Sequence, residues 1–174
     1  MFENSKWITF PQEVSVASFI KNIKFKKEVK KALMHISASG WYRLFINDNL
    51  FSNSYFTPGY TDYKYRTMFQ TYDITSSIKE NTKLEMMLAP GWGGSKHIAF
   101  TIGSYPYNEK SLIFDLEVTF VDGETIHYVS DENLDVYTNE IVFAEIYHGE
   151  TYDQSNRGQY LGKAKLASVS TELI

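Results

Sequence analysis

Short runs of alternating hydrophobic and polar residues recur along the chain, separated by turn-forming residues. The alternation is clearest over Tyr42–Ile46 (YRLFI) and Leu112–Phe120 (LIFDLEVTF), where a period of two predicts strands with one buried face. Further strands are expected at residues 14–25, 32–37, 67–73, 83–88, 125–129 and 142–147. Because no long amphipathic helix or internal repeat interrupts this pattern, we predict an all-β fold, a two-sheet antiparallel β-sandwich of jelly-roll type.

Turn residues lie between these runs. Asn47-Asp48-Asn49 and Asp122-Gly123 both favour a hairpin, since Asn, Asp and Gly tolerate positive φ. Residues 74–78 after Asp73 are expected to form one short helical turn, capped by Asp73 or Thr75. Residues 89–94 bend around Trp92, and the polar, Gly-bearing segment 149–162 is expected to be irregular.

Length and composition exclude several classes. The 174 residues suit a single domain, and the 13 Tyr and 12 Phe suit strands. The net charge of -4 gives no basic field for nucleic acid, and the absence of Cys excludes disulfides and thiolate sites. The one basic stretch, Lys21–Lys31, alternates with apolar residues and is interpreted as an edge strand. Without a secretory leader or a long apolar run, we expect a cytoplasmic protein with no membrane partner.

A series of short motifs, in a fixed order, resembles the N-terminal domain of bacterial α-L-rhamnosidases. The motifs are G-W-Y at 40–42, F-I-N at 45–47, T-P-G-Y-T-D-Y at 57–63, F-Q-T-Y-D-I-T at 69–75, G-W at 91–92 and Y-H-G-E-T-Y-D at 147–153. The chain departs from the family pattern in three places: Asn47-Asp48 where Asn-Gly is frequent, Tyr60 where Trp is common, and Gln154-Ser155 where a basic residue often stands.

The resemblance implies a galactose-binding-like β-sandwich over residues 1–165, followed at 166–174 by the start of a linker to a catalytic domain that the chain lacks. In this family, hydrolysis occurs in a separate (α/α)₆ barrel with its own acidic residues. The resemblance therefore implies an accessory, non-catalytic domain of a glycoside hydrolase acting on rhamnose-containing glycans, whose partner is the barrel of the same polypeptide. The alternative is a calcium-dependent L-rhamnose-binding module.

A sugar site requires an exposed aromatic platform beside hydrogen-bonding groups, because a saccharide has an apolar C–H face and a hydroxyl rim. The candidate carbohydrate-binding residues are Asn53, Tyr55, Thr57, Tyr60 and Trp92. If Ca²⁺ binds, Asp48, Asn53 and Asp62 are the nearest oxygen donors. Structural alternatives stay open for the aromatic and turn residues of this region. Trp41 and Trp92 can be core residues, Tyr60 and Tyr63 can be tyrosines that bond a loop, and Asn47-Asp48 can serve only as a turn.

Two further sets of residues contain carboxylates that are candidates for function or for a solvated surface. Glu150, Tyr152 and Asp153 lie in a polar segment and are candidates for contact with the catalytic domain, with a plain structural loop as the alternative. Asp115 and Glu117, two apart on one strand, are expected to be solvated. The four His residues lack metal-ligand spacing, and nucleotide-binding and serine-hydrolase motifs are absent from the sequence.

Overall fold

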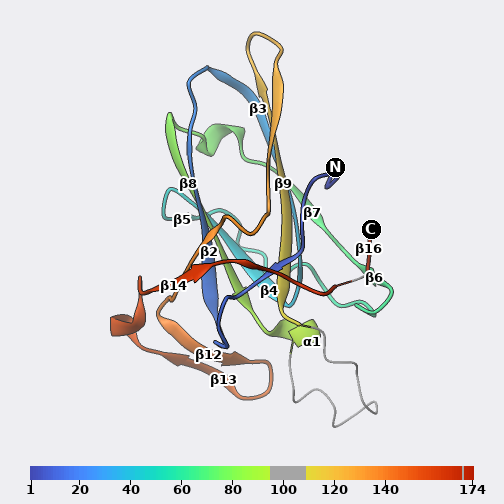
Figure 1. The fold of residues 1–174 in the computed structure, drawn as a ribbon, viewed down its shortest axis with the longest axis vertical. Coiled ribbons are helices and arrows are strands. Elements are labelled where there is room, and N and C mark those ends of the chain that lie inside the picture. Colours follow the sequence, from blue (N-terminus) through green and yellow to red (C-terminus); the bar gives the residue numbers. More distant parts are fainter. Residues whose placement is uncertain (95–108, 170) are drawn as a thin grey trace.

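Two six-stranded sheets lie face to face in the computed structural model, which describes residues 1–94, 109–169 and 171–174 (Figure 1). Sheet 1 has the order β15 (Lys165–Leu166), β1 (Ile8–Thr9), β9 (Ser111–Phe120), β3 (Val29–Ser39) and β7 (Gln70–Asp73), and β10 (Thr125–Val129) also pairs with β9. Sheet 2 has the order β14 (Tyr160–Lys163), β11 (Asp135–Tyr137), β2 (Ala17–Lys24), β8 (Asn81–Ala89), β4 (Trp41–Ile46) and β5 (Asn49–Leu50). All pairings within the two sheets are antiparallel, which confirms the predicted all-β sandwich.

Smaller elements lie outside the two main sheets. A two-stranded hairpin of β12 (Ile141–Glu145) and β13 (Gly149–Tyr152) lies at its lower end in Figure 1. Near the carboxyl end, β16 (Glu172–Leu173) runs parallel to β6 (Arg66–Thr67). The helical pieces within the described ranges are η1 (Thr75–Ser77), α1 (Gly91–Gly94) and η3 (Gln154–Asn156). None of the helices in the described part of the chain is long and apolar enough to cross a membrane.

The core lies between the sheets and follows from the alternation. On β3 and β9, Met34 opposes Leu116 and Ile36 opposes Phe114, and all four side chains are fully buried. They meet a second layer from sheet 2 that includes the fully buried Phe19. Burying each such side chain contributes roughly 1.5–3 kcal/mol, so the interdigitated layer between the sheets is the main source of stability.

The predicted turns are confirmed where local chemistry determines them. Asn47 and Asp48 have φ of 51° and 64°, the positive values that a two-residue hairpin turn between β4 and β5 requires. The helical turn after Asp73 is a 3₁₀ turn. The Asp73 carboxylate accepts the Thr75 N–H at 3.0 Å, although Ile74 occupies the cap position itself.

Two expectations about chain course are wrong. Residues 21–31 are not one edge strand, because the chain reverses after Phe25 and enters β3, and both β2 and β3 have neighbours on each side. Phe25 is buried against Phe120 and Tyr128, which holds this reversal in place. Segment 149–162 is not irregular either, since β13, η3 and β14 occupy most of it, joined by positive-φ glycines such as Gly158.

The expected solvation of Asp115 is also wrong. Asp115 points outward from sheet 1, yet it is only 2% exposed, because the N-terminal segment covers it and the backbone N–H of Phe2 donates to its carboxylate at 2.9 Å. At the other end of the chain, residues 165–166 and 172–173 pair with β1 and β6. The segment expected to begin a linker is therefore held against the domain, and a linker beyond it stays a prediction.

Candidate functional site

A hollow of about 410 Å³ opens beside the outer surface of β4. The alternation of β4 determines its floor: Tyr42, Leu44 and Ile46 are buried in the core, so Trp41 and Arg43 point to the opposite side. The loop after β5 adds further lining residues, among them Tyr55 and Phe56.

Aromatic rings form a connected cluster along this wall. The Trp41 ring lies 4.7 Å from that of Phe56 and 5.9 Å from that of Trp92, centroid to centroid. Tyr60 packs on Trp92 at 5.4 Å, and the Tyr55 ring lies 6.5 Å from Phe56. Tilted and edge-on pairs at these separations are attractive beyond their buried area, so the rings hold one another in place.

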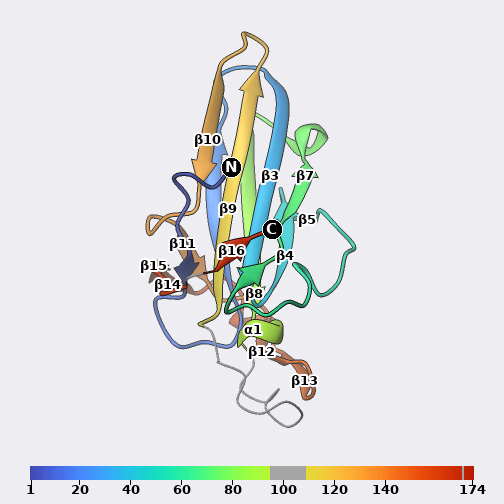
Figure 2. The same ribbon diagram turned by 90° about the vertical axis from the view of Figure 1, so that its right-hand side faces the viewer.

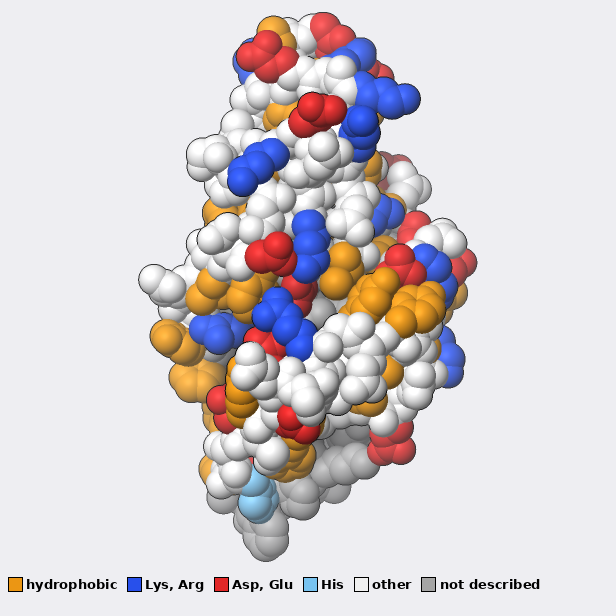
Figure 3. Space-filling model, turned by 90° about the vertical axis from the view of Figure 1, so that its left-hand side faces the viewer, with side chains coloured by type: hydrophobic (Ala, Val, Ile, Leu, Met, Phe, Trp, Pro, Cys, Tyr) orange, Lys and Arg blue, Asp and Glu red, His pale blue; other side chains and the backbone are white. Residues whose placement is uncertain are grey.

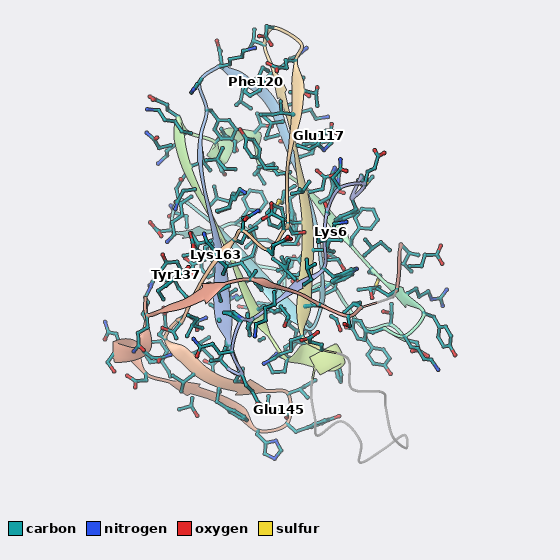
Figure 4. The ribbon with its side chains drawn as sticks, viewed as in Figure 1. Lys6, Glu117, Phe120, Tyr137, Glu145 and Lys163 are labelled. Atoms are coloured by element: carbon teal, nitrogen blue, oxygen red, sulfur yellow. The ribbon has the colours of Figure 1, made fainter. Side chains whose placement is uncertain are left out.

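The hairpin β12–β13 supplies the facing wall, with Ile141, Ala144, Glu145 and Glu150 among the lining residues. Glu145 is 8% exposed, and its carboxylate accepts the N–H of Tyr147 at 2.9 Å and contacts Nδ1 of His148 at 3.1 Å. Figure 4 shows Glu145 within the hairpin. Glu145 is thus committed to shaping the hairpin, whereas Glu150 is exposed.

The aromatic loop, residues 51–69, is held by specific hydrogen bonds. Thr57 exchanges two with the backbone of Tyr42, one through its own carbonyl at 3.2 Å and one through its hydroxyl at 2.9 Å. Gln70 donates to the Pro58 carbonyl at 2.8 Å, and the Tyr63 hydroxyl donates to the Gly59 carbonyl. A loop tied in this way presents its exposed rings in a fixed position.

The predicted carbohydrate-binding residues fall into three groups. Tyr55 and Trp92 line the hollow, and Tyr60 joins it through its contact with Trp92. Thr57 instead uses its hydroxyl to fasten the loop. Asn53 is exposed on the same loop but is not among the lining residues.

Sequence reasoning missed Trp41, Arg43 and Phe56 as lining residues. Trp41 was expected in the core, yet the period of β4 places it opposite the buried Tyr42. The alternation alone was therefore a sufficient signal for Trp41 and Arg43. Phe56 has a φ of 59°, a left-handed conformation that no sequence pattern marks for an aromatic residue.

Two of the three candidate calcium donors, Asp48 and Asp62, already have partners within the protein. Asp48 binds Lys83 Nζ at 2.7 Å, and this lysine holds the pKa of Asp48 below its usual value. Asp62 accepts the N–H of Lys64 at 3.2 Å within its own turn. Over the ranges that the structure describes, no group of three or more His, Cys, Asp or Glu residues is arranged to hold a metal ion.

The three predicted interdomain residues have different roles. Glu150 lines the hollow, and Tyr152 is 60% exposed on the hairpin. Asp153 begins η3, where its carboxylate accepts the N–H and the hydroxyl of Ser155, and these bonds lower its pKa. The surfaces around Tyr55 and around Glu150, which are far apart in the sequence, therefore meet at one hollow.

Comparison with known proteins identifies the family. The family model described as the α-L-rhamnosidase N-terminal domain matches residues 27–166, most of the chain. The chain belongs to this family. An α-L-rhamnosidase of Streptomyces avermitilis is 34% identical over 73% of the chain, and one of Formosa agariphila is 32% identical over 86%. The chain spans only 12% and 18% of the length of these two relatives.

Solved structures agree with this membership. The α-L-rhamnosidase of Dictyoglumus thermophilum matches 98% of the chain with a TM-score of 0.85 and 26% identity, and the chain covers 22% of that structure. The α-L-rhamnosidase of Aspergillus terreus gives 0.83 and 25% identity over 97% of the chain. A Pleurotus ostreatus lectin in complex with GalNAc gives 0.60 at 15% identity, a likeness of fold alone.

Proposed function

We propose that this α-L-rhamnosidase N-terminal domain is an accessory, non-catalytic part of a glycoside hydrolase acting on rhamnose-containing glycans. In this proposal the domain braces a catalytic barrel of the same polypeptide. The observation that carries the proposal is the small share of each relative that the chain spans, 12% and 18%, which places most of those enzymes outside this domain.

In this proposal the hairpin β12–β13 is the docking surface. Phe143, Tyr147 and Tyr152 are 39%, 63% and 60% exposed on it. Large exposed aromatic groups on a soluble domain mark contact surfaces, and Tyr is enriched among residues that dominate binding energy. The exposed carboxylate of Glu150 on β13 adds a polar rim, as protein interfaces usually have.

Association with the separately produced catalytic region of the parent polypeptide tests this role. Calorimetry should detect binding, and replacing both Tyr147 and Tyr152 by Ser should weaken it at least tenfold. Tyr65→Ser is the matched control, because Tyr65 is 64% exposed but lies on the aromatic loop. Unchanged affinity of the double variant, or equal loss in the control, would remove the hairpin as the docking surface.

The non-catalytic role has its own test. Glu145, the buried carboxylate that lines the hollow, has structural partners in the backbone N–H of Tyr147 and the imidazole of His148. The domain alone should therefore give no hydrolysis of an aryl α-L-rhamnoside. Turnover that copurifies with the domain and disappears in Glu150→Gln would contradict the proposal.

A sugar-binding role is the second candidate, and the hollow itself favours it. It combines the rings of Tyr55 and Trp92 with the charged groups of Arg43 and Glu150. Calorimetry with L-rhamnose at millimolar concentration, with and without Ca²⁺, tests it, with Trp92→Ala as the disabling variant and Tyr65→Ala as control. Absence of heat in both conditions refutes sugar binding, and heat that Trp92→Ala leaves intact moves the site elsewhere.

A further inference from the structure

A cluster of ionisable side chains lies on the outer face of sheet 1, under the N-terminal segment. His35 on β3 stands directly opposite Asp115 on β9, and Glu117 opposes His127 on β10. Asp115 Oδ1 contacts His127 Nδ1 at 2.7 Å. Both His35, at 5% exposed, and Asp115, at 2%, point away from the core and are nevertheless buried.

The N-terminal segment, residues 1–6, provides the cover and is called the latch below. Its inner end is fixed where Lys6 N–H donates to the Ser130 carbonyl at 2.8 Å and the Ser130 hydroxyl returns a bond to the Lys6 carbonyl at 2.7 Å. Figure 2 shows the latch lying over β9, and Figure 4 places Lys6 beside that strand.

The outer end of the latch is held by Phe2. Its N–H donates to Asp115 Oδ2 at 2.9 Å, and its ring packs edge-on to Phe69 at 5.4 Å and to His35 at 6.3 Å. Phe2 has a φ of 59°, which an aromatic residue adopts only at a cost in free energy. The closed latch is therefore a strained arrangement that depends on the contacts of this one residue.

His35 is the group whose charge state bears on closure. Its Nδ1 contacts the Thr71 hydroxyl at 2.8 Å, and the Phe2 and Phe69 rings lie against the imidazole. Burial lowers the pKa of His35 below its ordinary 6.5, and this effect outweighs the neighbouring Asp115 and Glu117, which raise it. The Met1 amino group and His127 lower the pKa further.

We propose that the latch is a pH-dependent device that stays closed over Asp115 while His35 is neutral and is released when His35 becomes protonated. Removing the Phe2 ring from the imidazole lets water reach the charged form, so protonation and opening are coupled. An imidazole with a depressed pKa stabilises the closed state above the ordinary value of 6.5, and this contribution is lost as pH falls through the lower, closed-state value. Between the two pKa values the ratio of open to closed latch rises by up to tenfold for each unit that pH falls, and below the lower value it levels off.

The absence of Cys allows a single probe on the latch. Glu3, which is exposed, is changed to Cys and labelled with a fluorophore, and anisotropy is followed between pH 7.5 and 4.5. We expect anisotropy to fall with acid as the latch gains freedom. In the same background, His35→Gln, whose amide can still bond Thr71, should remove the pH response, and His148→Gln should leave it unchanged.

Two further measurements keep the proposal refutable if His35→Gln fails to fold. Imidazole NMR should give His35 a pKa below 6.5, and Phe2→Gly, which removes both the ring and the strain, should raise it towards that value. A two-residue extension before Met1 displaces the amino group and should leave the response in place. Any one of three results overturns the proposal. The anisotropy does not change with pH, the response survives His35→Gln but vanishes in Asp115→Asn, or Phe2→Gly leaves the pKa of His35 unchanged.

Discussion

Tyr42→Phe is expected to destabilise the domain while leaving its packing intact. The Tyr42 side chain is 3% exposed and crosses from sheet 2 to sheet 1, where its hydroxyl donates to Gln70 Oε1 at 2.7 Å and contacts the Tyr72 hydroxyl at 3.1 Å. Burial, with the Tyr72 hydroxyl, raises the pKa of Tyr42 far above its usual range, so the donor is present at every working pH. Phe keeps the ring and deletes only this donor.

The loss in free energy of unfolding depends on Gln70 Oε1, the acceptor that Tyr42→Phe leaves without its donor. Gln70 Oε1 would lose its donor in a partly buried position, which costs about 1–3 kcal/mol. With a urea slope of about 2 kcal/mol per molar, the unfolding midpoint should fall by about 0.5–1.5 M. Because Gln70 also holds the Pro58 carbonyl, the aromatic loop should loosen as well, which tryptophan fluorescence of Trp92 can follow.

Tyr72→Phe is the matched control. Tyr72 is half-buried, and Tyr72→Phe removes only its hydroxyl. The shorter hydrogen bond from Tyr42 to Gln70 stays in place, so the cost in free energy of unfolding should stay below about 1 kcal/mol. Equal urea slopes for both variants are needed to compare their midpoints. A Tyr42→Phe midpoint equal to that of the unaltered domain, or a larger loss in Tyr72→Phe, would refute the argument that this hydroxyl joins the sheets.

Two further predictions concern packing. Phe114→Ala, in the fully buried layer, should cost about 3–5 kcal/mol in urea unfolding, whereas Phe143→Ala on the exposed hairpin should stay within about 0.5 kcal/mol; similar costs would mean that the hairpin is part of the core. Gly40→Ala would place a Cβ 2.5 Å from the Ala89 carbonyl oxygen, whereas at Gly123 a Cβ meets nothing within 4 Å. Both have positive φ, so the excess melting-temperature loss of Gly40→Ala measures the clash, and equal losses would contradict it.

The sequence predicted what local chemistry determines. Alternation identified β4 and β9, and Asn47-Asp48 identified the turn, because these signals act between neighbouring residues. It failed at residues 21–31, where a charged run looks the same in an exposed strand and in a reversal between two strands. The difference is made by Phe25, which packs on Phe120, a residue far away in the chain.

The candidate site was predictable only in part for the same reason. Tyr55 and Glu150 were each singled out from their surroundings, but nothing in either segment shows that both line one hollow. Their meeting depends on how the hairpin β12–β13 folds back beside β4. Long-range placement of this kind is decided by the packing of whole sheets.

The distribution of surface charge does not indicate where the hollow and the latch lie. Figure 3 shows acidic and basic side chains interspersed over one face, as expected for a net charge of -4 made of many opposed groups. Lys27, for example, binds both Asp122 and Glu124 at an exposed turn. Exposed pairs of this kind contribute little to stability, so they mark neither the hollow nor the latch.

The hollow and the latch share one feature: in each, a strand residue that points outward from its sheet is covered by another part of the chain. Alternation correctly assigns Trp41 and Asp115 to the outer faces of their sheets, and both are then covered, one by the aromatic loop and the other by the latch. A cover over an outer face is not needed to complete the core between the sheets. The candidate sugar-binding role of the hollow and the pH-dependent role of the latch are therefore proposed at two positions that the stability of the sandwich does not require.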